Sequence, residues 1–347
     1  MKKTLHALVL AVAALSLLTA TAAAGTILSV STRTLTNPYQ ANYKVGGELF
    51  VKQEGKGKEL VVLTCEGNSE KQVNDIKSLV SRAQGDVVFM IDPNEATDVL
   101  PIAIALEEAG VYYSTWWNKP DDMDVWDFPH WVSHMAYDGV AAGRTAGEIL
   151  FKTFKTPNKG KIVALQGMLA NYANQSRFDG LQEALRNNPG VEMVATESAD
   201  WDRSKAYEKT KNLLIANPDI DGIWCANDNM ALGALEALRE RGLVGKVQVT
   251  GCDGVDEVFE AIKKGEIAAT VFQDSKFQAG ISLTHALAAK QGKLKVADIP
   301  KEKRQFFVEA VYVTPENIAE FEEKYIKNTP VYDFDDMYSS FYRTMED

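Results

Sequence analysis

A repeated alternation of short apolar segments and longer amphipathic segments most constrains the fold of this 347-residue chain. Short apolar runs bounded by turn residues are typical of buried strands, and the segments between them carry apolar residues at helical spacing. Strands that alternate with helices favour parallel sheets covered by helices, the doubly wound α/β class. The predicted strands are 26–31, 59–64, 86–91, 111–114, 131–135, 161–165, 191–196, 222–225, 246–251 and 267–272, and the clearest predicted helices are 39–52, 72–83, 141–154 and 230–241.

The alternation breaks once, in the segment WWNKPDDMDVWDFPHWVSH between Trp116 and His134. Two prolines and many aromatic residues make this segment irregular, and we interpret it as a crossing between two lobes joined by a multi-strand hinge. A final strand around 306–312 and a helix at 315–327 close the chain. The predicted first lobe comprises 25–137 plus 274–303, and the predicted second lobe and tail comprise 138–273 plus 304–347.

The first 24 residues have the layout of a secretory signal peptide. Lys2 and Lys3 precede an apolar run over 7–18, and small residues ending in Ala-Ala-Ala offer a cleavage site before Gly25. The alternative is an N-terminal membrane anchor, for which the apolar run is short. No cysteine lies near the cleavage site, so we predict a soluble periplasmic protein rather than a lipid-anchored one.

Charge and cysteine content exclude some functions and leave others open. The formal net charge is −11, and it becomes −13 when the two lysines of the signal peptide leave. Because no stripe of basic residues remains, a nucleic-acid partner is not expected. Cys65, Cys225 and Cys252 lie in apolar stretches and are predicted to be buried thiols, although pairing of Cys225 with Cys252 stays open. His130 and His134 fall in a strand or loop pattern, so no metal site is predicted.

Polar and aromatic side chains follow the ends of the predicted strands in both halves of the chain. In open parallel sheets, ligands bind outside the carboxyl ends of the strands. Amides, carboxylates and a guanidinium suit vicinal hydroxyls, and aromatic rings cover the C–H faces of a sugar. Helix capping would explain several of the Asn and Asp residues taken singly. The candidate ligand-binding residues from this survey are Asn37, Tyr39, Asp92, Trp117, Asn118, Asn171, Arg177, Trp201, Asn227, Asp253 and Gln273.

Sequence signatures of common enzyme classes are not found. The chain has no G-x-G-x-x-G after a strand, no P-loop and no G-x-S-x-G. Asp92 and Asp253 could flank a glycosidic bond, but no acid–base partner is evident. We therefore predict a binding protein without a cofactor rather than an enzyme.

Several segments together resemble the type I periplasmic sugar-binding proteins, the ribose and galactose binders of ABC importers. They are VSTRTLTNPY, WCANDNMALGALEAL, VTGCDGVDE and GEIAATVFQ, and the likeness extends from about residue 26 to residue 314. The resemblance implies a type I fold that captures a monosaccharide or polyol by hinge closure and delivers it to a membrane permease. A sugar-sensing partner of a chemoreceptor or sensor kinase would use the same pocket. We expect a monomer.

The resemblance also implies roles for the candidate residues. Tyr39 and Trp201 would be stacking walls, Arg177 would hold ring hydroxyls with Asn171 nearby, and the remaining contacts would come from Asn37, Asn118, Asn227, Asp253 and Gln273. Asp92 stands where ribose binders usually have Asn, and Gln40 replaces a second aromatic residue. Tyr137 occupies a position where a small polar residue is common, and we include it among the ligand-binding candidates. These departures leave the identity of the sugar open.

Overall fold

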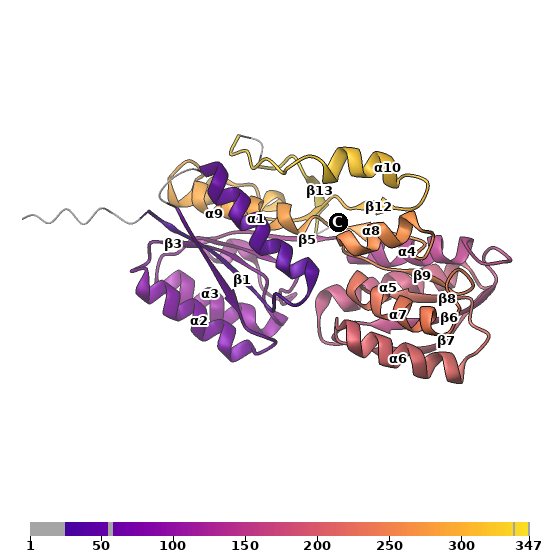
Figure 1. Cartoon of the computed structure of the whole chain (residues 1–347). Coiled ribbons are helices and arrows are strands. Elements are labelled where there is room, and N and C mark those ends of the chain that lie inside the picture. The colour runs from indigo at the N-terminus through magenta and orange to yellow at the C-terminus, as the bar shows by residue number, and fades with distance from the viewer. Residues whose placement is uncertain (1–24, 55–57, 336, 346–347) are drawn as a thin grey trace, which may run out of the picture.

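The computed structural model describes residues 25–54, 58–335 and 337–345, and Figure 1 shows them as two lobes lying side by side. The predicted signal peptide lies outside this range. The strands are β1 (Ile27–Thr32), β2 (Glu59–Thr64), β3 (Val87–Ile91), β4 (Tyr113–Trp116), β5 (Trp131–Tyr137), β6 (Gly160–Gln166), β7 (Val191–Ser198), β8 (Gly222–Cys225), β9 (Gln248–Thr250), β10 (Thr270–Phe272), β11 (Gln305–Val308), β12 (Val311–Val313) and β13 (Phe341–Thr344). The α-helices are α1 (Pro38–Glu54), α2 (Ser69–Arg82), α3 (Val99–Glu108), α4 (Gly139–Lys152), α5 (Tyr172–Asn187), α6 (Arg203–Ala216), α7 (Asp228–Glu240), α8 (Asp256–Lys263), α9 (Ser275–Lys290) and α10 (Ile318–Phe321).

The first lobe is built on a seven-stranded sheet in the order β13-β11-β5-β4-β3-β1-β2. Its strands pair in parallel except β13, which runs antiparallel to β11. Successive side chains of a strand point to opposite faces, so Val88 and Met90 pack in the cluster that contains residues of α1 and α9. Phe89 and Ile91 pack on the other face, in the cluster with residues of α2 and α3. Both faces are therefore covered, and only the strand ends are free to hold a ligand.

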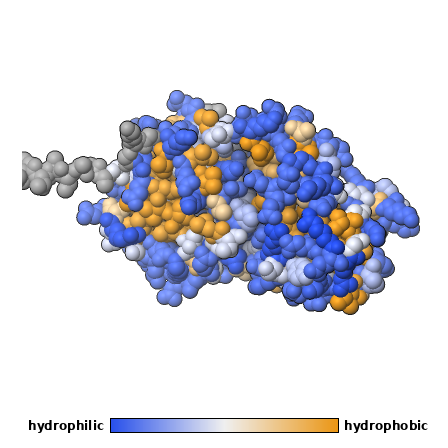
Figure 2. All heavy atoms as spheres, viewed as in Figure 1, coloured by the Kyte–Doolittle hydropathy of each residue, from blue (hydrophilic) through white to orange (hydrophobic). Residues whose placement is uncertain are grey.

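The outer edge of this sheet is formed by β2, which pairs with β1 alone among the described strands. Its apolar residues, Leu60 to Leu63, are half-buried rather than buried. Figure 2 shows that apolar surface on the viewed face gathers on the first lobe, between α1 and α2. The rest of this face is mostly hydrophilic, as expected for an acidic protein with a polar surface.

The second lobe contains a parallel sheet in the order β7-β6-β8-β9 and an antiparallel pair, β10 and β12. Two isolated bridges, Thr250 to Ala269 and Asp253 to Phe272, connect the segments around β9 and β10. Helices α4 and α5 approach closely because α4 has glycine at its contact surface. A Cβ atom on Gly143 would lie 1.8 Å from the carbonyl oxygen of Arg177. The packing thus fixes the part of α5 that carries Arg177.

Every strand and helix predicted before residue 273 is present, with small differences at the ends. The prediction is wrong for the last part of the chain. The single strand expected at 306–312 is two strands in different lobes, because the chain leaves β11 and enters β12 after two residues. The helix expected at 315–327 is α10 followed by a π-helix, Glu322–Ile326.

The assignment of 304–347 to the second lobe also needs correction. Strands β11 and β13 belong to the first-lobe sheet, so the tail returns across the hinge. The ring of Tyr332 occupies the space above Gly280 of α9, and its hydroxyl donates to the carbonyl oxygen of Lys276 at 3.0 Å. Gln53 of α1 bonds the backbone of Tyr332 through both amide atoms. These contacts anchor the tail to the first lobe.

Within the described residues, no helix is long and apolar enough to cross a membrane. The three cysteines are buried free thiols, as predicted, and the disulfide that was left open between Cys225 and Cys252 is not formed. Burial raises the pKa of all three thiols. They therefore behave as small apolar side chains of the core.

Candidate ligand-binding site

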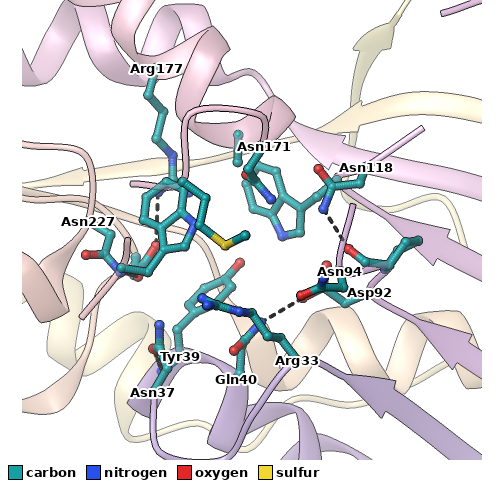
Figure 3. A pocket seen from close by; sticks show the side chains of 16 residues that line it. Arg33, Asn37, Tyr39, Gln40, Asp92, Asn94, Asn118, Asn171, Arg177 and Asn227 are labelled. Atoms are coloured by element: carbon teal, nitrogen blue, oxygen red, sulfur yellow. Dashed lines mark hydrogen bonds and ion pairs between the residues drawn. The ribbon is translucent and has the colours of Figure 1, made fainter. Parts of the chain in front are cut away.

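A cavity lies between the two lobes, at the carboxyl ends of strands from both parallel sheets (Figure 3). This is the edge at which the sequence predicts a ligand, since all the loops that leave it carry polar residues. Ten of the twelve predicted residues line the cavity, and Tyr137 and Gln273 do not. The lining residues are Arg33, Asn37, Tyr39, Gln40, Asp92, Pro93, Asn94, Trp117, Asn118, Met168, Asn171, Ala173, Arg177, Trp201, Asn227 and Asp253.

Two tryptophans, one from each lobe, cover the guanidinium of Arg177. Its central carbon lies 5.2 Å from the ring centroid of Trp117 and 5.8 Å from that of Trp201. Both tryptophans have left-handed backbones, each with φ 65°, a conformation that is uncommon for bulky residues and points to a local constraint. The Trp201 ring lies against Gly167, where an added Cβ would stand 2.2 Å from it. The aromatic walls are thus held by the backbone around them.

Hydrogen bonds fix the direction of the Arg177 side chain. Its terminal nitrogens donate to the carbonyl oxygen of Ala226 at 2.7 Å, to Oδ1 of Asp253 at 3.3 Å and to Oε1 of Gln273 at 2.6 Å. The other carboxylate oxygen of Asp253 accepts from Asn227 at 3.2 Å. Burial raises the pKa of Asp253, and the attraction of Arg177 opposes that rise. The buried Nε of Arg177 has no partner among the described residues.

The first lobe supplies a second carboxylate. Asp92 is 6% exposed, and its Oδ2 accepts from Nε2 of Gln40 at 3.1 Å. Burial raises the pKa of Asp92 to about 7, and the bond from Gln40 and the charge of Arg33 oppose the rise. No salt bridge to Asp92 is present among the described residues, in contrast to Asp253. Asn94 contributes a buried Oδ1 without a partner in the described part of the chain.

The two predicted residues outside the cavity lie directly behind its lining. Tyr137 packs against Trp117, with ring centroids 5.8 Å apart, and against Trp116 at the same separation. Gln273 is fully buried and accepts from Arg177. Both therefore support wall residues. The sequence analysis predicts a ligand contact for both residues, for Gln273 from the family resemblance and for Tyr137 from its departure from the family pattern, whereas neither side chain lines the cavity.

Some lining residues were not predicted as site residues. Arg33, Asn94 and Met168 lie one to three residues beyond the ends of β1, β3 and β6. A survey of every residue within three positions of a strand end would have included them. Gln40, which departs from the family pattern, also donates to Asp92 and lines the cavity.

The histidine pair of the crossing segment bonds to protein groups. His134 is buried and its Nδ1 lies 2.8 Å from Oγ1 of Thr115, while Nδ1 of His130 lies 2.6 Å from Oε2 of Glu107. Desolvation lowers the pKa of His134 well below its usual value. In residues 25–54, 58–335 and 337–345, no group of three His, Cys, Asp or Glu side chains is placed to hold a metal ion.

A two-lobed α/β fold with a polar and aromatic cavity between the lobes is the architecture of a known family. The chain belongs to the periplasmic binding protein domain family, which it matches over residues 28–294. It is 33% identical over 272 residues to the ribose import binding protein of Salmonella typhimurium, covering 78% of this chain and 87% of that one. These findings confirm the predicted family.

Two solved structures confirm the fold. A twin-arginine translocation pathway signal protein from Burkholderia phytofirmans is 38% identical, with a TM-score of 0.88 that covers 92% of this chain and 98% of that one. An ABC transporter periplasmic solute binding protein from Actinobacillus succinogenes, with bound D-allose, is 27% identical. Its TM-score is 0.75, and the match covers 85% of this chain and 99% of that one.

Proposed function

We propose that this protein is the periplasmic solute-binding protein of an ABC importer and captures a monosaccharide or related polyol by closure of its two lobes. The observation that carries the proposal is the Arg177 guanidinium, which lies between Trp117 of the first lobe and Trp201 of the second. Arg177 belongs to the second lobe, so a ligand that contacts both its guanidinium and the neighbouring Trp117 ring bridges the lobes and therefore stabilises the closed form. Relatives named for ribose and D-allose support the ligand class.

The chemistry of the lining fits polyhydroxylated ligands. A hydroxyl group both donates and accepts, so it can meet a carboxylate with its hydrogen and an amide or guanidinium with its oxygen. Asp92 and Asp253 supply the acceptors, and Arg177 supplies charge-assisted donors. Indole rings next to these groups can cover the apolar face of a pyranose or cyclitol ring. We infer binding without turnover, and glycosides should stay intact on incubation with the protein.

A thermal-shift screen of the mature protein against pentoses, hexoses and polyols tests the ligand class. A true ligand raises the melting temperature in a saturable way, by the equivalent of about 2.7 kcal/mol at a concentration of 100 Kd. Calorimetry on Arg177→Ala and Asp253→Ala should then show loss of binding, and Arg144→Ala, which removes a surface ion pair to Glu183, should not. Unchanged affinity in the cavity variants would place the site elsewhere. A screen without any hit would reject the ligand class.

Delivery to a membrane permease and export by cleavage complete the proposal. One relative from Escherichia coli is named as a D-allose-binding periplasmic protein, and the Actinobacillus succinogenes structure is named as an ABC transporter periplasmic solute binding protein. The basic and apolar N-terminus has the layout that directs export. Mass spectrometry of the periplasmic fraction should find a chain that begins at Gly25. A chain that keeps its first 24 residues in the membrane fraction would favour the anchor instead.

A further inference from the structure

Two hydrogen bonds connect the lobes directly at the cavity. Oδ1 of Asn118 accepts from the backbone N–H of Tyr172 at 3.2 Å, and a terminal nitrogen of Arg33 donates to the carbonyl oxygen of Asp200 at 3.4 Å. Asn118 and Arg33 lie in loops that follow first-lobe strands, whereas Tyr172 is the first residue of α5 and Asp200 lies in the loop that follows β7 of the second lobe. In Figure 3, Asn118 and Arg33 lie on different sides of the cavity. The two bonds therefore hold the lobes together at two separate points around it.

Asn118 caps a helix of the opposite lobe. Tyr172 is the first residue of α5, and N–H groups in the first turn of a helix have no acceptor within that helix. The side chain of Asn171 serves Asn174 N, so Asn118 serves the N–H of Tyr172 that would otherwise remain free. The amide of Asn118 is oriented from its own lobe, because its Nδ2 donates to the carbonyl oxygen of Pro93 at 2.7 Å. At 1% exposure, it is committed to protein partners on both sides.

Arg33 bonds a turn whose shape is fixed independently. Asp200 and Trp201 are consecutive left-handed residues, with φ 51° and 65°. The Asp200 carboxylate accepts from Ser198 Oγ at 2.9 Å and from Lys205 Nζ at 2.8 Å, which holds the turn in place. The turn therefore presents its carbonyl oxygen to Arg33 and its next side chain, Trp201, to the cavity. A bond at this carbonyl couples closure of the lobes to the position of an aromatic wall.

We propose that Asn118 and Arg33 are positioning residues. Through their two interlobe hydrogen bonds, they stabilise the closed form of the protein even without ligand. The inference rests on the proposed function, since it takes the cleft to open and close. It replaces the ligand-contact role that the family resemblance implies for Asn118. When the lobes open, the donor and acceptor of each of these two hydrogen bonds form hydrogen bonds with water instead. Only the net free energy of each interlobe hydrogen bond therefore favours closure. A net hydrogen bond shifts an equilibrium by roughly two- to tenfold, which sets the scale of the effect.

Distances between two spin labels measure this equilibrium without ligand. Helices α2 and α6 lie on the side of the molecule away from the crossing segments, so opening separates them (Figure 1). Labels at Glu70→Cys and Glu208→Cys, both exposed positions, report the separation, and the buried native thiols are protected from labelling. Asn118→Ala and Arg33→Ala should each raise the ratio of long to short distances by roughly two- to tenfold. Asn68→Ala removes a comparable helix cap within one lobe and should leave the ratio unchanged.

Each outcome decides the inference. The inference is overturned if Asn118→Ala and Arg33→Ala both give the same ligand-free label distances as the Asn68→Ala control. It is also overturned if these variants lose ligand affinity while their ligand-free label distances stay unchanged. If Asn118→Ala does not fold, as judged by circular dichroism, Arg33→Ala decides alone because its half-exposed side chain is not part of the core. If no sugar or polyol binds but the label distances still shift in the Asn118→Ala and Arg33→Ala variants, the proposed ligand class is wrong and the stabilising role of the two interlobe hydrogen bonds is supported.

Discussion

Replacing Asp92 with Asn should change how the stability of the ligand-free protein depends on pH. The carboxyl is 6% exposed, and burial raises its pKa from 3.8 to about 7. A raised carboxyl pKa means that the folded state holds the proton more tightly than the unfolded state. The resulting stability is full below pH 3.8 and is lost as the pH rises through about 7. Asparagine cannot ionise, and its side-chain oxygen can still accept from Gln40.

The size of the effect follows from the shift. A rise of about three pKa units, at 1.36 kcal/mol per unit, corresponds to about 4 kcal/mol between the two ends of the pH range. This is an upper value, because Asp92 lines an open cavity and water that enters it solvates the carboxylate. The free energy of unfolding of Asp92→Asn, relative to that of the parent, should therefore increase by between about 1 and 4 kcal/mol as the pH rises from about 4 to about 8.

Urea unfolding of both proteins across that pH range measures the difference. Asp202→Asn is the matched control, since Asp202 is an exposed cap of α6 and asparagine also caps helices. The control should show no comparable gain. The reasoning is refuted if the free energy of unfolding of Asp92→Asn, relative to that of the parent, stays constant or falls as the pH rises from about 4 to about 8.

Three further predictions follow from the cavity and the core. Arg177→Ala leaves Asp253 buried without its counter-charge, so the free energy of unfolding in urea should fall by about 3–5 kcal/mol. An unchanged urea midpoint would contradict this. Gly167→Ala adds a Cβ 2.2 Å from the Trp201 ring and should displace it, so calorimetry should show ligand affinity falling by roughly tenfold; equal affinity would mean that this ring is no wall. The three buried thiols should react with a thiol reagent only at the rate of unfolding, and a fast reaction in native buffer would show that one of them is accessible.

The fold of both lobes could be predicted as far as residue 273 because local pattern decides it. Strands such as β3 and β8 are short, wholly buried and bounded by turns or helices, so their apolar runs identify them directly. The last part of the chain follows a different logic. The change of sheet between Val308 and Val311 depends on which distant strand each short segment pairs with, β5 or β10, and a local pattern does not record that pairing.

The position of the interlobe cavity could be predicted for a similar reason. Asn37, Arg177 and Asp253 are far apart in the chain, but each lies beyond the carboxyl end of a parallel strand, and parallel strands bring those ends to one edge. The detailed roles could not be predicted. Whether Asn118 contacts a ligand or Tyr172 depends on how the two lobes meet. Gln273 lies behind Arg177, which lines the cavity, and the sequence does not distinguish these two depths.

The seven-stranded sheet has a further consequence for how the chain acquires its structure. Its strands come from 27–137 and from 305–344, so all of β6 to β10 lies between β5 and its neighbour β11. Pairing across such a separation must close a long loop and is slow, whereas the β6–β9 sheet uses neighbouring segments. We expect the second lobe to gain protection from hydrogen exchange first. The first lobe should gain it only after the last strands join their sheet.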